Sequence, residues 1–269
     1  MLFATSHHRG CVPLRMKYRM TKTYDKQFHQ WVNMTALRSA GVIVPLIQKQ
    51  VTLTSVLDVG CGHGAWLKIW SQLGGVEIFG LDGAHVDKEA LLIPFQRFQF
   101  ADLQEDWSLY RRFDMVQCLE VAEHLPPASA EGFVRRLCQH GDVVLFSAAQ
   151  PGQGGERHVN ERRPSYWAHL FLDNGFLAFD SLRPLVAQQK LVDPWYRYNT
   201  VIFANPTGAD RLTAVARACR ITNLTDLDQG GDLAWQVRRI ILRPLPEPIV
   251  THLSRLRYRL LLAHFNRAS

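Results

Sequence analysis

The stretch from Phe113 to Pro127, FDMVQCLEVAEHLPP, ends an apolar run with three side chains suited to chemistry: Glu120, Glu123 and His124. Residues at i, i+3 and i+4 share one face of a helical turn, so two carboxylates and an imidazole would converge there. Such a trio is half of a divalent-metal site. The loop sequence GQGGERHVN offers a further ligand from another segment, His158.

Three interpretations of these four residues stand side by side. In the first, Glu120, Glu123, His124 and His158 bind a divalent metal, and the imidazoles favour Mn²⁺, Fe²⁺ or Zn²⁺ over Mg²⁺. In the second, His124 or His158 acts as a metal-free base beside Glu120. In the third, the acids favour a helix N-terminus and the turn is purely structural. The residues alone leave this choice open.

Apolar runs alternate with helical patterns through the middle of the chain, which predicts βαβ units and a parallel sheet covered on both faces. The last two runs have only a loop between them and predict an antiparallel pair. The expected fold class is therefore α/β, a Rossmann-like, doubly wound, mostly parallel seven-stranded sheet with an antiparallel last strand. The expected strands are Ser55–Val59, Val76–Leu81, Phe98–Phe100, Phe113–Cys118, Asp142–Ser147, Leu177–Leu182 and Thr200–Ala204.

A glycine-rich turn follows the first expected strand in the sequence SVLDVGCGHGAWL. Gly60 and Gly62 permit a tight turn and a close approach of a ligand to the backbone beside a helix N-terminus. An acid precedes the turn, Asp58, and another ends the second strand about 20 residues later, Asp82, where it would accept hydrogen bonds from ribose hydroxyls. Asp102 follows the third strand. This pattern predicts a nucleotide-binding edge of the sheet.

The motifs LDVGCGHG, GLDG, ADL and FDMVQCLEVAEHL resemble those of the class I S-adenosylmethionine-dependent methyltransferases, over roughly Tyr24 to Asn205. The resemblance implies that Gly60 and Gly62 lie near the methionine part of the cofactor and that Asp82 holds the ribose. It also implies an adenine site, a wall for the methyl-bearing end and a lid aromatic. Together the candidate cofactor residues are Tyr24, Asp58, Gly60, Cys61, Gly62, Asp82, Gly83, Asp102, Leu103 and Cys118.

The E-x-x-E-H turn resembles two groups of methyltransferases in particular: the small-RNA 3′-end 2′-O-methyltransferases and the ubiquinone-biosynthesis O-methyltransferases. In both groups two neighbouring oxygens of the acceptor chelate a metal ion. Matched residue by residue, the resemblance implies the ligands Glu120, Glu123, His124 and His158. The surroundings of His158 do not otherwise resemble the RNA enzymes, which places RNA second as an acceptor.

Helical patterns flank the sheet. An N-terminal helical lid is expected over Tyr24–Gln50, as one or two helices interrupted near Gly41 and Pro45. The expected organisation is a flexible basic tail at residues 1–22, a methyltransferase domain at 23–206 and a basic helical extension at 207–269. The helical patterns of that extension are Gly208–Arg220, Asp232–Leu242 and Ile249–Asn266.

Composition narrows the class of protein. The five cysteines of this 269-residue chain are scattered without a CxxC pair, which favours reduced thiols and a cytoplasmic location. No apolar run reaches the length of a membrane span. The net charge of +7 favours acidic partners, namely nucleic acid, phosphorylated substrates or anionic lipid contacted by the C-terminal basic helix.

The expected activity is O-methylation of a hydroxyl on a small molecule or glycan, through a metal-chelated diol if the metal interpretation holds. Three alternatives remain: an RNA 2′-O-methyltransferase, an N-methyltransferase of a small amine, and a non-catalytic cofactor-binding partner protein. A loop containing Arg162 and Arg163 and the sequence DPWYRYN, with Trp195, Tyr196 and Tyr198, would stack on a planar ring or simply pack at the edge of the sheet.

Overall fold

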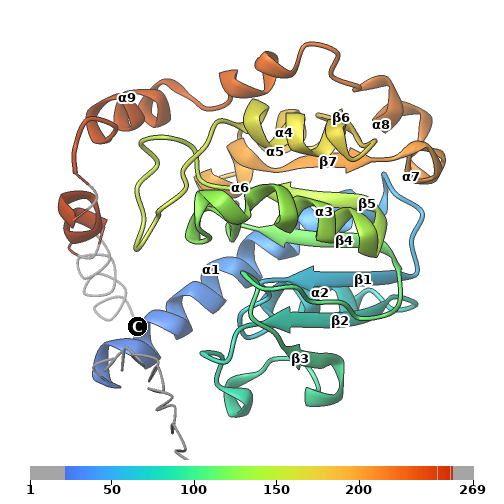
Figure 1. Ribbon diagram of the computed structural model, residues 1–269, viewed down its shortest axis with the longest axis horizontal. Helices are drawn as coiled ribbons and strands as arrows, with labels where there is room; N and C mark the ends of the chain where they lie inside the picture. Colours follow the sequence, from blue (N-terminus) through green and yellow to red (C-terminus); the bar gives the residue numbers. More distant parts are fainter. Residues whose placement is uncertain (1–21, 247, 255, 257–269) are drawn as a thin grey trace, which may run out of the picture.

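The computed structural model describes residues 22–246, 248–254 and 256, and it contains the expected mixed sheet (Figure 1). Its order is β3-β2-β1-β4-β5-β7-β6. All paired strands are parallel except that β7 runs antiparallel to both of its neighbours, β5 and β6. The strands are β1 (Ser55–Val59), β2 (Glu77–Asp82), β3 (Phe98–Phe100), β4 (Phe113–Leu119), β5 (Gly141–Ser147), β6 (Leu177–Phe179) and β7 (Val201–Ala204).

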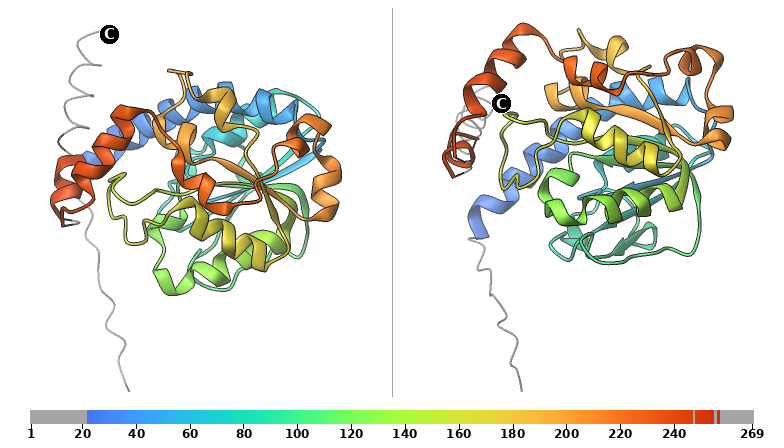
Figure 2. Two further views of the ribbon diagram at one scale, coloured as in Figure 1. Left: turned by 90° about the horizontal axis from the view of Figure 1, so that it is seen from above. Right: turned by 45° about the horizontal axis from the view of Figure 1, so that its top comes forward.

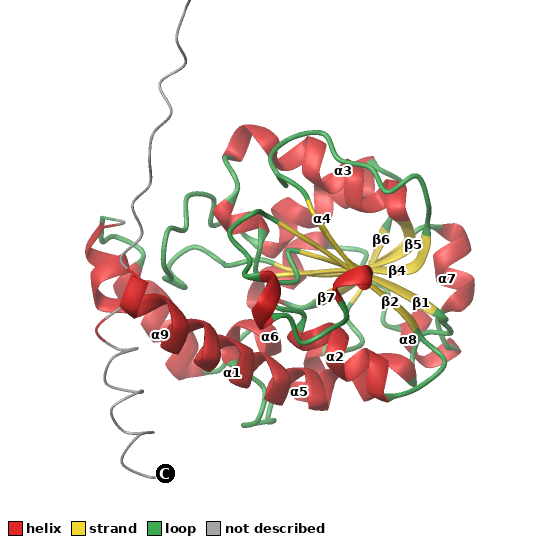
Figure 3. Ribbon diagram, turned by 90° about the horizontal axis from the view of Figure 1, so that it is seen from below, coloured by secondary structure: helices red, strands yellow, loops and turns green. Residues whose placement is uncertain are grey.

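Buried side chains alternate between the two faces of the sheet, as the period of a strand requires. Val56 and Met115 enter the core on one face, whereas Leu57 and Val116 enter the core on the other. Helices cover both faces, and Figure 3 shows α1, α2 and α5 on one side and α3 and α4 on the other. Burial on both faces explains why β4 and β5 are nearly continuous apolar runs.

The helices hold the sheet and its connections. Besides α1 (Lys22–Gln48) they are α2 (Ala65–Gln72), α3 (Ala130–His140), α4 (Pro164–Asp173), α5 (Arg183–Val186), α6 (Pro194–Asn199), α7 (Pro206–Arg211), α8 (Ala214–Ala218) and α9 (Leu233–Leu242). Short 3₁₀ turns are η1 (Lys88–Ala90), η2 (Phe95–Arg97), η3 (Ala122–His124), η4 (Pro127–Ser129) and η5 (Leu224–Gln229).

Three expectations about helices were wrong. The N-terminal pattern is a single helix that continues through Pro45, because burial of residues such as Ile43 and Ile47 compensates for the missing backbone donor. The connection between β6 and β7 is not only a loop, since α5 and α6 occupy it. The pattern expected as one helix over Gly208–Arg220 is broken into α7 and α8, with Leu212 extended between them.

Residues after 206 pack onto the domain. Leu227 of η5 is fully buried, and Asp228 accepts hydrogen bonds from the backbone N and the hydroxyl of Ser165, both at 2.9 Å, at the start of α4. Tyr198 donates its hydroxyl to Asp232 at 2.8 Å. Helical backbone resumes over residues 248–254, and the rest of the expected helix to Asn266 lies outside the described residues, as does the tail before Lys22. None of the described helices is long and apolar enough to cross a membrane.

Candidate active site

The first functional element is the glycine turn after β1. Gly60 has φ +80°, and its backbone N donates to the Leu81 carbonyl at 2.7 Å. A Cβ there would overlap the side chain of Val121, so the close approach of the turn to the segment after β4 requires glycine. Gly62 also has positive φ, but no atom of the described residues lies within 4 Å of the place where its Cβ would be. Val121 therefore fills the space next to Gly60, whereas the space next to Gly62 is open to a ligand.

Asp82, the last residue of β2, faces this turn. One carboxylate oxygen accepts from the Gly62 N and the other from the Gly83 N, each at 2.6 Å. His85 lies 3.5 Å from the same carboxylate, an ion pair when the imidazole is protonated. Each oxygen keeps a lone pair for a further donor. A held carboxylate beside an open glycine turn fits the ribose and methionine end of S-adenosylmethionine.

Other candidate cofactor residues lie around the same edge. Asp58 is buried under the turn, and burial raises the pKa of its carboxyl to about 7, with Gln117 lowering it and Asp82 raising it further. Asp102 is exposed and Leu103 is buried. The side chains of Cys61 and Cys118 are buried, which raises the pKa of both thiols.

Tyr24 lies in the first turn of α1, but its side chain is outside the described part of the structure. Its expected role as a lid aromatic therefore stays a prediction.

The turn after β4 is not the expected α-helical turn. β4 continues to Leu119, and Glu120 then adopts a left-handed backbone conformation, φ +56°, while its N donates to the Ser147 carbonyl at 3.0 Å. Few residues remain before Pro126, and Leu125 is extended as a residue before proline tends to be. Ala122–His124 therefore forms a single 3₁₀ turn.

In this geometry the Glu120 carboxylate still lies next to that of Glu123, but amide donors occupy its oxygens. Its Oε2 accepts from Gln153 Nε2 at 2.6 Å, and its Oε1 accepts from Asn199 Nδ2 at 3.2 Å. Asn199 is also hydrogen-bonded to Gln150 and Gln153. Burial raises the pKa of Glu120, and the amide donors offset part of that rise. Glu120 thus belongs to a buried amide network at the β5 end, a network that sequence analysis did not predict.

Glu123, His124 and His158 do come together. One potential ligand atom from each lies within 4.8 Å of the others, and no other such cluster occurs among the described residues. The loop after β5 is tied to the turn by the Val159 and Asn160 backbone N atoms, which donate to the Glu123 carbonyl at 2.9 and 3.0 Å. Exposure to solvent increases across the site, from buried Glu123 to exposed His124, so the site opens to solvent at one side.

Both histidines are held by acceptors at Nδ1. The Arg157 carbonyl lies 3.4 Å from His124 Nδ1, and Glu161 Oε1 lies 2.9 Å from His158 Nδ1. These oxygens only accept, so each Nδ1 carries the hydrogen and each Nε2 keeps a lone pair for a ligand or a proton. Glu161 is itself held by the backbone N of Gly152 and Gly154, at 2.8 and 3.0 Å. Sequence analysis missed Glu161, although its i+3 spacing from His158 was a usable signal.

The electrostatics of the cluster match a cation. Glu123 is 1% exposed, and its oxygens form no hydrogen bond of normal geometry with the described residues, although the backbone N–H groups of Glu123 and Ala149 are near enough to lower its pKa in part. Burial, followed by repulsion from Glu120, raises its pKa well above the usual range. Desolvation by the groups around it lowers the pKa of His124, even though its side chain is partly exposed. Electrostatic repulsion from His158 lowers that pKa further. A buried carboxylate with no hydrogen-bond partner, close to two imidazoles that each keep a free ring nitrogen, fits a divalent ion.

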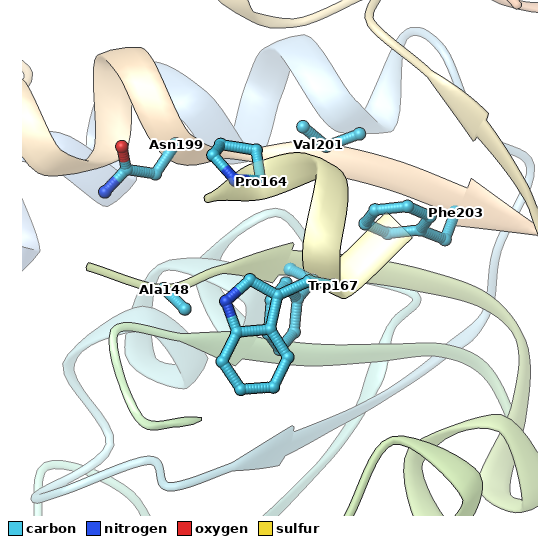
Figure 4. Close-up of a pocket in the computed structure, with 7 residues that line it drawn as sticks. Ala148, Pro164, Trp167, Asn199, Val201 and Phe203 are labelled. Carbon is cyan, nitrogen blue, oxygen red and sulfur yellow. The ribbon is translucent and has the colours of Figure 1, made fainter. Parts of the chain in front are cut away.

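The aromatic cluster of α6 serves packing. Tyr196 is buried against Trp66, with ring centroids 5.0 Å apart, and Tyr198 packs against Trp235. Asn199, Trp167 and Phe203 are among the side chains that line a small cavity, and Figure 4 shows how they lie. Its volume of about 10 Å³ is close to that of one water, too small for a substrate.

Known proteins resemble this chain over its central part. The methyltransferase domain family matches residues 24–191. A ubiquinone biosynthesis O-methyltransferase of Histophilus somni is 32% identical over 116 residues, which is 38% of this chain and 48% of that protein. The corresponding protein of Thiobacillus denitrificans is 32% identical over 130 residues, 45% of this chain and 53% of the relative. The chain thus spans about half the length of the curated relatives it matches.

Among solved structures, the sugar N-methyltransferase KedS8 from Streptoalloteichus has a similar fold, with a TM-score of 0.54 and 15% identity over 74% of this chain and 99% of that one. This likeness concerns the fold alone. The family match covers more than half of the chain, and the strand order with its antiparallel β7 agrees with it. The chain therefore belongs to the methyltransferase domain family.

Proposed function

We propose that the protein methylates a hydroxyl group that has a second oxygen beside it, on a small molecule or glycan, with a divalent ion held by Glu123, His124 and His158. The observation that carries the proposal is the Glu123 carboxylate, buried without a donor and flanked by the two imidazoles. The similarity to O-methyltransferases of ubiquinone biosynthesis supports oxygen as the acceptor atom.

Cofactor binding and acceptor binding fall to different residues at the carboxyl edge of the sheet. Asp82 and the open turn at Gly62 receive the S-adenosylmethionine, while the segment after β4 brings the acceptor side next to it, because Val121 contacts Gly60. A divalent ion in the cluster would lower the pKa of a hydroxyl bound to it. Positioning of that hydroxyl in line with the methyl group supplies the remaining rate enhancement.

The ligand set proposed here has three protein side chains, and Glu120 is outside it. Glu120 and its amide partners lie beside the cluster. They form a polar wall that would hydrogen-bond with the molecule to be methylated. Three protein ligands leave positions on an ion for two neighbouring oxygens of a diol or catechol. The exposed side of His124 gives the acceptor its way in.

The test joins metal analysis to turnover. Purified protein is stripped with a chelator, reconstituted with Mg²⁺, Mn²⁺, Fe²⁺ or Zn²⁺, and assayed on catechols, vicinal diols and matched compounds with a single hydroxyl. We expect turnover only with metal and only on the paired oxygens. Full turnover after chelation, with no metal recovered, would reject the chelated acceptor and favour a metal-free base.

Two substitutions separate the two halves of the site. Glu123→Gln should lose the metal and the turnover but keep S-adenosylhomocysteine binding. Asp82→Asn should weaken S-adenosylhomocysteine binding by about 100-fold, because charged hydrogen bonds are lost, and keep the metal. If either substitution removed both ligands without unfolding the protein, the assignment of separate roles would be wrong.

A further inference from the structure

Positive charge is concentrated at the C-terminal end of the chain. Residues 233–269 contain seven arginines and one acid, Glu247, a net charge of +6 against +7 for the whole chain. Residues 23–232 contain 19 lysines and arginines and 23 acids, a net charge of −4, and residues 1–22 hold the remaining five basic residues. The domain body is therefore mildly acidic, and the basic end stands out from it.

The same C-terminal segment exposes large aliphatic side chains. On α9, Leu233 is 77% exposed and Ile240 is 72% exposed, and their i, i+7 spacing places them on one face. Exposed Ile249 and Leu253 continue the apolar surface on the helical residues 248–254. Between the two helical segments lies a groove of about 530 Å³ whose apolar lining includes Val237, Ile241, Val250, Leu242 and Leu253.

We propose that α9 and residues 248–254 dock on the surface of an anionic phospholipid bilayer. An aliphatic face joined to a basic segment is the pattern of helices that lie in the membrane interface, where apolar burial and attraction to anionic headgroups add. The proposed contact is peripheral, and none of the described helices is both long and apolar enough to cross the bilayer. Proteins bind single-stranded RNA with a basic groove and aromatic side chains that stack on the bases, whereas the exposed large side chains of this surface are aliphatic, which favours a bilayer.

This surface is joined to the candidate active site. Arg239 Nε donates to the Pro151 carbonyl at 3.3 Å, and Thr251 Oγ1 donates to the Gly155 carbonyl at 3.4 Å. A Cβ on Gly152 would overlap the backbone of Arg239. Figure 2 shows α9 beside the loop after β5, outside the strands. The loop that carries His158 and Glu161 therefore contacts the two helical segments of the proposed docking surface, although the docking itself does not depend on the proposed function.

The test is co-sedimentation of the full-length protein with vesicles of phosphatidylcholine, with and without phosphatidylglycerol, over a range of salt. We expect binding to the anionic vesicles that weakens as salt rises. Ile240→Ser should weaken it about tenfold or more, because an inserted aliphatic side chain is lost. Arg243→Gln, at an exposed arginine of the same surface, should weaken it about fivefold.

Matched controls are Val215→Ser, 78% exposed on α8, and Arg135→Gln, exposed on α3. Both should bind vesicles as the unaltered protein does, and all four variants should keep its melting temperature. Equal binding of all variants, or none to anionic vesicles, would overturn the proposal. A dimer in light scattering that Ile240→Ser dissociates would also overturn it, since a second copy would then cover the surface. So would binding of RNA together with vesicle binding that Ile240→Ser leaves unchanged.

Discussion

Glu123 illustrates how neighbours decide the chemistry of a residue. Its backbone carbonyl receives two donors from the loop after β5, while its carboxylate, 1% exposed, receives none among the described residues. Glu120, three residues earlier, has the same side chain and a different role, because Gln153 and Asn199 occupy its oxygens. The E-x-x-E-H motif thus contains one glutamate suited to a cation and one already satisfied by amides.

The first residue-scale prediction concerns Glu161 as the residue that positions His158. In Glu161→Gln an amide NH₂ replaces an acceptor oxygen, so the tautomer of His158 is no longer specified. We expect Mn²⁺ affinity to fall by about 10- to 100-fold, with S-adenosylhomocysteine affinity unchanged, as measured by calorimetric titration. Glu131→Gln, exposed on α3, is the control. Unchanged Mn²⁺ affinity in Glu161→Gln would show that the contact is only structural.

The second prediction concerns Asp58, whose pKa is raised from its ordinary value to about 7, mainly by burial. The folded chain then holds this proton more tightly than the unfolded chain, so stability falls as pH rises through the window between the two pKa values. Asp58→Asn removes that loss. Between about pH 5 and pH 7, we expect the unfolding free energy of the variant to rise by up to about 3 kcal/mol relative to that of the unaltered protein. Urea unfolding without ligands measures this difference. Parallel stability curves would contradict a buried, proton-binding Asp58.

At the scale of elements, the site forms where three connections meet at the carboxyl edge of the sheet. The turn after β1 contacts the turn after β4 through Gly60 and Val121. The loop after β5 is bound to the β4 turn through the Glu123 carbonyl. Since β1, β4 and β5 are adjacent and parallel, their carboxyl ends lie together, and short loops suffice to join cofactor and acceptor sides.

The element-scale prediction compares two glycines of one turn. Gly62→Ala should cost about 1 kcal/mol of unfolding free energy, because its positive φ disfavours a side chain but space is open. Gly60→Ala should cost about 2–3 kcal/mol, because overlap with Val121 adds to the same backbone term. Adding Val121→Ala to Gly60→Ala should restore only the part of the unfolding free energy that the overlap had removed. A double-mutant cycle in urea would show this. Equal costs for the two glycines would contradict the close contact.

At the scale of the whole molecule, the C-terminal residues have two parts with different surroundings. Residues up to about Trp235 contribute to the core, through Leu227, Trp235 and the bonds of Asp228 to Ser165. The other side chains of α9 and the next helical residues expose an aliphatic face, and these segments contact the body through the loop after β5. The first part completes the fold, and the second is available to a partner.

The whole-molecule prediction follows from Leu227, which is fully buried. Leu227→Ala should lower the unfolding free energy by about 2–4 kcal/mol, the usual cost of a cavity at a buried leucine. Val215→Ala, on exposed α8, should change it by less than about 0.5 kcal/mol. Thermal and urea unfolding of both variants check this. A small effect at Leu227 would mean that the segment after α8 is not part of the cooperative core.

The sequence by itself determined the strands, the mixed sheet and the position of the glycine turn, because long apolar runs and glycine spacing are local signals. The ends of β1 and β3 match the expectation to the residue, whereas β6 ends at Phe179 and not at the expected Leu182. Only the tertiary structure decided the conformation of the E-x-x-E-H turn, the amide partners of Glu120, and the pairing of His158 with Glu161. Those outcomes depend on which donors and acceptors distant segments bring to a buried carboxylate, and no periodicity along the chain records that.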